Sequence, residues 1–253
     1  MTRVIITGAK GRMGQALIAC APQLRDNIKI VGQVNRRDNL AAIIDSGDVV
    51  VDFSSHTTTL GFVELCAKRK KAIVIGTTGH SDIEKSEITK FKSEIVMVWA
   101  SNFSLGINTL FWLIQEMARV LDVRYDLEIL EMHHRWKKDA PSGTAKTFAE
   151  KLNAIRKSQL GVDLVGRYGR AGIVGERQPQ EIGVHSIRGG DTVGDHTIIF
   201  AGNDERIEVT HRASSRAAFA HGALHAAIWA ADQQADGKPG LYDMQDVLRL
   251  KKM

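Results

Sequence analysis

Residues 128–145, EILEMHHRWKKDAPSGTA, hold a dense group of side chains suited to proton chemistry. His133 and His134 are adjacent, and Lys137 and Asp139 follow them. Reduction of a conjugated double bond needs a hydride at one carbon and a proton at another, and histidine transfers protons near neutral pH. A neighbouring lysine stabilises developing negative charge or supplies the proton itself. The segment therefore predicts an active site for an acidic compound.

The end of this segment, Pro-Ser-Gly-Thr at 141–144, is typical of a helix start. Backbone N–H groups at such a turn suit a carboxylate. Other interpretations stay open: the histidines and lysines are solvated, and Ser142 or Thr144 only caps a helix. A metal site made by His133, His134 and Asp139 has a spacing that matches no common ligand pattern, so we expect no metal.

A second motif, GAKGRMG at 8–14, follows a β-branched run and opens a helix. Glycines in this position permit a tight turn and close approach to a pyrophosphate, which the helix N-terminus then binds. The alternative is a strand-to-helix turn that only needs positive φ. The position favours a dinucleotide site, with expected contacts at Gly8, Ala9, Lys10, Gly11, Arg12 and Met13.

The second strand ends in Asn35, Arg36 and Arg37, at the place where an acidic residue would bind the ribose hydroxyls of NAD. No carboxylate is expected there, and two guanidinium groups are available for a 2′-phosphate. We therefore expect Asn35 and Arg36 to contact the cofactor and NADPH to be preferred over NADH. A solvated loop end is the alternative.

Two further segments follow strands, GTTG at 76–79 and ASNFS at 100–104. Ligands of open α/β sheets bind at the carboxyl ends of the strands, so small and hydroxyl residues here suit a nicotinamide and its ribose. Plain turns are the alternative. The expected contacts are Gly76, Thr77, Thr78, Ala100, Ser101, Asn102 and Phe103.

The elements that must position these residues alternate between strand and helix over the first hundred residues. Such a pattern predicts a parallel, doubly wound, Rossmann-like sheet covered on both faces. The expected strands are Val4–Thr7, Lys29–Val34, Val49–Phe53, Ala72–Ile75 and Ile95–Val98. The expected helices are Gln15–Ala21, Thr59–Lys71 and Ser81–Glu94, with Ser81 as the N-cap.

The pattern changes after residue 103. We expect helices at Leu105–Leu121 and Ala145–Lys157, a strand at Leu127–Met132, and strands without intervening helices from Ile182 to Thr210, with a hairpin turn at 202–204. This predicts an inserted α+β domain with a mixed sheet at 105–214, for substrate binding and tetramerisation. The dinucleotide-binding domain is then 1–104 plus 215–253, with an alanine-rich helix at Ala217–Gln233 returning to it.

Bulk properties exclude several classes of protein. The 253 residues carry a net charge of +5, but Lys and Arg are spread along the chain without interleaved aromatics, so we expect no nucleic acid partner. No apolar run is long enough to span a bilayer, and the N-terminus lacks a signal-peptide pattern, so we expect no membrane and a cytoplasmic protein. The two scattered cysteines do not form a disulfide framework.

Taken together, these motifs resemble the dihydrodipicolinate reductase family, whose signature is E-x-H-H-x-x-K-x-D-A-P-S-G-T-A. The segment EMHHRWKKDAPSGTA follows it, and GxxGRMG, VDFS, GTTG, SNFS and RGGDTVGDHTIIF occur in the family's order. The resemblance covers nearly the whole chain. One departure is Asn35, which stands where many members have an acid.

The resemblance implies reduction of 4-hydroxy-tetrahydrodipicolinate, a small dicarboxylate, to tetrahydrodipicolinate in lysine and diaminopimelate biosynthesis, with NADPH or NADH as hydride donor. It implies His133 as proton donor or acceptor, Lys137 as second acid, and His134 as a substrate contact. The backbone of Gly143 and Thr144 would hold a substrate carboxylate, and the protein would be a homotetramer. Alternatives are another NAD(P)-dependent dehydrogenase of an amino-acid pathway and a dinucleotide-sensing regulator without catalysis.

Overall fold

The computed structural model describes residues 1–252, which divide into two compact units. Unit 1 comprises Met1–Leu105 and Arg216–Met253, and unit 2 comprises Gly106–Ser215. Each unit contains its own sheet and its own apolar core. No helix within the described residues is both long and apolar enough to cross a bilayer.

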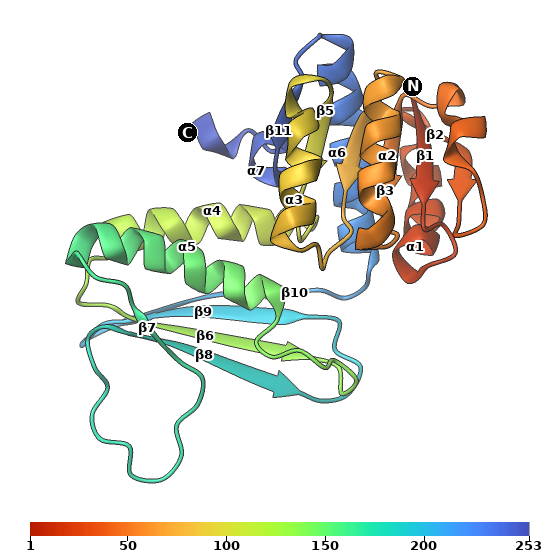
Figure 1. The fold of residues 1–253 in the computed structure, drawn as a ribbon. Coiled ribbons are helices and arrows are strands. Elements are labelled where there is room, and N and C mark those ends of the chain that lie inside the picture. The colour runs from red at the N-terminus through yellow and green to blue at the C-terminus, as the bar shows by residue number, and fades with distance from the viewer. Residues whose placement is uncertain (253) are drawn as a thin grey trace. The chain divides into compact units, whose positions relative to one another are not determined.

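Unit 1 is built on a six-stranded parallel sheet in the order β11-β5-β4-β3-β1-β2 (Figure 1). The five predicted strands are confirmed to within two residues. Four of them are mostly buried on both faces, as is typical of a parallel sheet covered by helices, and the edge strand β2 is mostly half-buried or exposed. The sixth strand, β11, was not predicted. The strands are β1 (Thr2–Thr7), β2 (Ile28–Val34), β3 (Val49–Asp52), β4 (Ala72–Ile75), β5 (Val96–Trp99) and β11 (Gly240–Tyr242).

The helices of unit 1 pack against both faces of the sheet and form an apolar layer with it on each side. Val4 and Ile6 of β1 pack in one layer with residues of α1 and α6, and Ile5 packs in the other layer with residues of α2 and α3. Ser81 caps α3 through a capping box with Glu84, which confirms the predicted cap. The helices are α1 (Arg12–Cys20), α2 (His56–Lys68), α3 (Asp82–Thr89), α6 (Ala217–Ala235) and α7 (Met244–Val247), and short 3₁₀ helices are η1 (Ala21–Leu24), η2 (Leu40–Ala42), η3 (Ile44–Ser46), η4 (Lys90–Ser93) and η5 (Leu250–Lys252).

Unit 2 contains a five-stranded mixed sheet in the order β10-β9-β6-β8-β7. β8 runs parallel to β6 and β7, whereas β9 runs antiparallel to β6 and β10. Helices α4 and α5 lie together on one face of this sheet (Figure 1). The elements are α4 (Leu105–Val120), β6 (Asp126–His133), α5 (Gly143–Leu160), β7 (Val165–Arg167), β8 (Glu181–Arg188), β9 (Asp195–Ala201) and β10 (Arg206–Arg212).

A buried arginine joins the two helices of unit 2. Arg156 of α5 is 2% exposed and donates to the carbonyl oxygens of Ala118 at 3.2 Å and Leu121 at 2.9 Å, at the end of α4. Its positive charge therefore lies at the negative end of that helix.

The predicted hairpin is also confirmed, because Gly202 N donates to Glu205 O at 2.9 Å between β9 and β10.

Candidate active site

His133 is the last residue of β6, and its side chain is bonded to a buried carboxylate on the same strand. Nδ1 of His133 lies 2.6 Å from Oε2 of Glu131, two residues earlier and on the same face of the sheet. The side chain of Glu131 is fully buried and that of His133 is 11% exposed. Glu131 and His133 continue the buried face of β6 that begins with the core residues Leu127 and Ile129, so the strand places a carboxylate and an imidazole at the end of that face.

Glu131 also accepts hydrogen bonds from two other elements. Arg188, at the end of β8, binds it with both terminal nitrogens, Nη1 to Oε2 and Nη2 to Oε1, each at 2.8 Å. The backbone N–H of Ser142 donates to Oε1 at 3.1 Å. Burial alone would raise the pKa of Glu131, but the hydrogen bonds from His133 and Arg188 outweigh it and hold the pKa well below its usual range. The carboxylate is therefore ionised near neutral pH.

A second buried histidine, His196 of β9, lies beside this pair. Its ring is edge-on to that of His133, with 5.2 Å between centroids, and its Nε2 lies 3.2 Å from Oγ of Ser142. Burial, followed by the proximity of His133, lowers the pKa of His196 to about 3. His196 is therefore a neutral neighbour of His133.

The loop after β6 brings the remaining charged candidates near this end of the sheet. Nζ of Lys137 forms an ion pair with Oδ1 of Asp139 at 2.9 Å, and the lysine side chain is 20% exposed. Arg188 Nη2 donates to the carbonyl of Asp139 at 2.7 Å, which ties the loop to β8. His134 is half-buried, its ring lies 5.8 Å from that of Trp136, and its Nδ1 has no hydrogen-bond partner within residues 1–252.

Helix α5 begins at the predicted Pro-Ser-Gly-Thr turn. Ser142 is the N-cap and its Oγ accepts from Ala145 N at 3.2 Å. The first bond within the helix runs from Lys146 N to Ser142 O, so the N–H of exposed Gly143 precedes it and can bind an anion. Thr144 follows as a half-buried residue. Through Ser142 N and Oγ, this turn is bonded to both Glu131 and His196.

In unit 1, the glycine motif forms the tight turn between β1 and α1. Gly8 has φ +71°, and a Cβ at Gly8 would lie 2.3 Å from the carbonyl oxygen of Phe53, so only glycine fits. Gly11 is the N-cap of α1 and provides no capping side chain. The first helical bond runs from Gln15 N to Gly11 O, which leaves the amides of Arg12 and the two residues after it without an acceptor inside the helix. This turn fits a pyrophosphate.

The side chain of Asn35, an expected cofactor contact, is hydrogen-bonded to the glycine turn and to Asp38. Its Oδ1 accepts from Lys10 N at 2.8 Å and its Nδ2 donates to Oδ2 of Asp38 at 3.1 Å, so its side chain braces the glycine turn. The expectation that no carboxylate stands here is wrong, because the chain turns after Asn35 and brings Asp38 back to it. Arg36 and Arg37 are exposed.

A buried carboxylate, Asp52 at the end of β3, joins the loops at the carboxyl edge of this sheet. It accepts hydrogen bonds from the hydroxyls of Thr7 at 2.6 Å, Thr59 at 2.8 Å and Thr77 at 3.0 Å. Ser54 adds its backbone N–H at 3.1 Å. The glycine turn and the GTTG segment are therefore tied to one residue, which the sequence interpretation assigned no role.

The other expected cofactor contacts differ in whether their side chains are exposed to solvent. Ala9 and Phe103 have buried side chains, so only their backbones can reach a ligand. A Cβ at Gly76 would lie 2.2 Å from the ring of Phe53, and the neighbouring GTTG residue Thr78 is exposed. The remaining candidates are exposed or half-buried: Lys10, Gly11, Arg12, Met13, Ala100, Ser101 and Asn102. Within residues 1–252, no group of His, Cys, Asp and Glu side chains is placed to hold a metal ion.

Unit 1 has a parallel sheet with a glycine turn after its first strand. Unit 2 has a histidine–carboxylate pair beside a helix N-terminus. Together these features define an α/β oxidoreductase of two units. The family model described as dihydrodipicolinate reductase, N-terminus, matches residues 2–103, and that described as dihydrodipicolinate reductase, C-terminus, matches residues 106–248. The chain belongs to the dihydrodipicolinate reductase family. Membership implies a nicotinamide dinucleotide as cofactor.

Full-length relatives agree with this assignment. The chain is 45% identical to the 4-hydroxy-tetrahydrodipicolinate reductase of Akkermansia muciniphila, with 100% of both chains covered. It is 44% identical to the enzyme of the same name from Hahella chejuensis, with 99% of this chain and 100% of the relative covered.

Solved structures show the same fold. The dipicolinate-bound dihydrodipicolinate reductase of Paenisporosarcina sp. TG-14 has a TM-score of 0.74 at 24% identity, covering 97% of this chain and 98% of that one. A mutant meso-diaminopimelate dehydrogenase from Clostridium tetani has a TM-score of 0.59 at 13% identity, covering 97% and 94%. The predicted fold class, a parallel sheet with a second mixed-sheet domain, is confirmed.

Proposed function

We propose that this chain catalyses the NAD(P)H-dependent reduction of 4-hydroxy-tetrahydrodipicolinate to tetrahydrodipicolinate, with loss of water, in lysine biosynthesis. The observation that carries the proposal is the His133–Glu131 pair beside the first turn of α5, in a chain that matches reductases of this name along its full length. A bound nicotinamide dinucleotide would supply the hydride.

The side chains of unit 2 would supply the other parts of the reaction. His133, with Nδ1 bonded to Glu131, would exchange a proton with the substrate through its other nitrogen. Lys137 would stabilise negative charge on the intermediate or act as the second acid. His134 would contact the substrate, and the backbone of Gly143 and Thr144 would receive one of its two carboxylates.

Unit 1 would bind the cofactor. The glycine turn and the start of α1 would hold the pyrophosphate, while the segments at 76–78 and 100–103 would contact the nicotinamide and its ribose. We further propose that NADPH is preferred, because Arg36 and Arg37 are exposed beside the end of β2 and the carboxylate of Asp38 is already hydrogen-bonded by Asn35.

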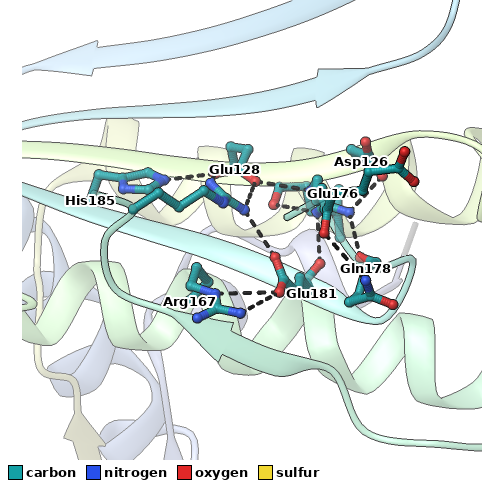
Figure 2. Close-up of polar contacts among 10 residues, drawn as sticks. Asp126, Glu128, Arg167, Glu176, Gln178, Glu181 and His185 are labelled. Atoms are coloured by element: carbon teal, nitrogen blue, oxygen red, sulfur yellow. Dashed lines mark hydrogen bonds and ion pairs between the residues drawn. The ribbon is translucent and has the colours of Figure 1, made fainter. Parts of the chain in front are cut away.

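The proposed assembly is a homotetramer joined through the sheet of unit 2. Its face opposite α4 and α5 exposes Leu130 and Ile187. On the same face, Glu128 is bonded to His185 and Glu181 to Arg167, as Figure 2 shows. Because these carboxylates have partners within the chain, another subunit could cover the face without leaving an unpaired buried charge.

Light scattering tests the assembly. A particle of four chains is expected, and Leu130→Lys should reduce it to smaller species because a charge would be buried at the contact. A wild-type monomer would contradict the tetramer and leave the proposed reaction untouched.

We also propose a cytosolic location, because Cys20 and Cys66 are free and buried, as is common in a reducing compartment.

The activity is tested by following cofactor oxidation at 340 nm, with substrate made in situ from pyruvate and aspartate semialdehyde by the preceding synthase. Oxidation that depends on the synthase supports the proposal, and the ratio of NADPH and NADH rates tests the preference. Absence of oxidation from folded protein contradicts it. In that case amino-acid substrates test another dehydrogenase activity, and binding of NADPH without turnover indicates a dinucleotide sensor.

A further inference from the structure

Glu131 is hydrogen-bonded to three elements of the candidate site in unit 2, namely β6, β8 and the first turn of α5. One carboxylate oxygen, Oε2, meets His133 and Arg188, and the other, Oε1, meets Arg188 and the N–H of Ser142. Its cross-strand neighbour Ser186 adds a further hydrogen bond. A fully buried carboxylate with this set of donors has one orientation, because moving either oxygen would break several charge-assisted bonds at once.

The contact with His133 determines which ring nitrogen is available for chemistry. An ionised carboxylate only accepts hydrogen bonds, so Nδ1 of His133 must carry the proton of their 2.6 Å contact. Nε2 is then the atom that exchanges a proton with a ligand, and a carboxylate in this position also stabilises the imidazolium form. The same carboxylate holds Ser142 N, so the ring has a fixed relation to the first turn of α5.

We propose that Glu131 is a positioning residue for the reaction, which sets the tautomer of His133 and holds it beside the turn that receives a substrate carboxylate, with Arg188 keeping Glu131 oriented and charged. This proposal rests on the proposed function. It differs from a purely structural role, in which the Glu131–Arg188 ion pair would only stabilise the end of the sheet. A structural role predicts effects on folding alone, whereas a positioning role predicts effects on the chemistry of His133.

Kinetics of Glu131→Gln separate the two roles. The amide has the shape of the carboxylate but donates to Nδ1, which favours the opposite tautomer. We expect kcat to fall on the order of 10²-fold, within the roughly 10²–10⁴-fold that a general acid contributes, while KM for the substrate changes less. The alkaline limb of the pH–rate profile should move to lower pH, because the imidazolium loses its anionic partner.

Glu128→Gln is the matched control. Glu128 is also on β6 and also binds a histidine and arginines, with His185 Nε2 at 2.7 Å and Arg170 Nη2 at 3.1 Å, but it lies on the opposite face of the sheet. The pH–rate profile of this variant should not move, and an equal shift in both variants would overturn the proposal. So would a folded Glu131→Gln enzyme with wild-type kcat and pH profile.

A spectroscopic measurement tests the proposal without turnover. In ¹⁵N NMR of the wild-type protein, with the signals of His133 assigned by their loss in His133→Gln, the neutral ring should be protonated at Nδ1. A neutral ring protonated at Nε2 would overturn the proposal even if Glu131→Gln failed to fold. Failure of the proposed function gives a different pattern, because wild-type protein would then show the Nδ1-protonated ring but no synthase-dependent oxidation of either cofactor.

Discussion

The backbone of Gly194 lies against the free edge of the His133 ring, and a Cβ at Gly194 would be 3.0 Å from Nε2. This is the nitrogen that the bond to Glu131 leaves available. Glycine at the position just before β9 therefore keeps open the side of the imidazole on which a proton would be exchanged, although the residue lies about sixty positions from His133 in the sequence.

Gly194→Ala should impair catalysis by crowding that nitrogen. The added methyl group would occupy the side of the ring on which the proton is exchanged, so we expect kcat/KM for the substrate to fall roughly tenfold or more. Steady-state kinetics measure this, and binding of NADPH should be unaffected. Gly189→Ala is the control, because a Cβ there would meet its nearest atom, on Met132, at an ordinary 3.5 Å. Equal losses in both variants would argue against crowding of His133.

Asp52→Asn should weaken binding of the cofactor. The carboxylate orders Thr7 and Thr77, and hydrogen bonds to a charged group contribute about 1.5–3 kcal/mol. We expect KM for NADPH to rise roughly tenfold, with a smaller change in KM for the substrate. Asp48→Asn removes a carboxylate just before the other end of β3, where it binds Arg3, and serves as control. An unchanged KM for NADPH in Asp52→Asn would refute the role of Asp52.

Replacing Arg36 and Arg37 together by alanine should lower kcat/KM for NADPH by roughly 10- to 100-fold, since charge-assisted bonds to a phosphate contribute about 1.5–3 kcal/mol. The value for NADH should stay nearly constant, because NADH has no 2′-phosphate. Arg25→Ala, at the opposite end of β2, is the control. Equal losses for both cofactors would show that the pair does not recognise the 2′-phosphate.

The stability of the protein should fall between pH 6.5 and pH 4.5, in part through His196. Because its pKa is lowered to about 3 in the folded protein from an ordinary 6.5, the unfolded chain binds a proton in this range that the folded chain does not. The free energy of unfolding therefore decreases as pH falls, by at most about 1.4 kcal/mol per pH unit for one histidine.

Urea unfolding at several pH values measures this dependence. His196→Gln should flatten it, whereas His225→Gln, which changes an exposed histidine of α6, should leave the slope unchanged. The buried His80 and the half-buried His211 also have lowered pKa values, chiefly through loss of solvation, so some slope should remain. A full wild-type slope in His196→Gln would contradict the assignment.

The sequence predicted most of the fold because its signals are local. Short β-branched runs identify five strands of unit 1, and the glycine turn and Ser81 mark helix starts that the structure shows. Strand β11 was missed because it has only three residues and begins at the last glycine of a Gly-Lys-Pro-Gly stretch, and its pairing with β5 depends on tertiary structure alone. Strand β7 was missed for the same reason, because it too has only three residues.

The candidate site was only partly predictable for a related reason. His133, Lys137 and the turn at Ser142 stand close together in the sequence, so their chemistry is visible there. The positions of Glu131 and Asp52 became informative only once distant partners were known, Arg188 for the first and Thr77 for the second. The carboxylate of Asp38 was overlooked because the turn that returns it to Asn35 has no strong glycine or proline signal.

The discontinuity of unit 1 has a consequence for synthesis on the ribosome. Helix α6 and strand β11 belong to the first unit, yet they follow unit 2 in the chain. Val4, Val74 and Val98 pack in one cluster with residues of α6. The part of this apolar face that α1 does not cover therefore stays exposed on the nascent sheet until α6 has been translated. Unit 2 is contiguous and can fold earlier, which makes the N-terminal sheet a natural client for a chaperone during translation.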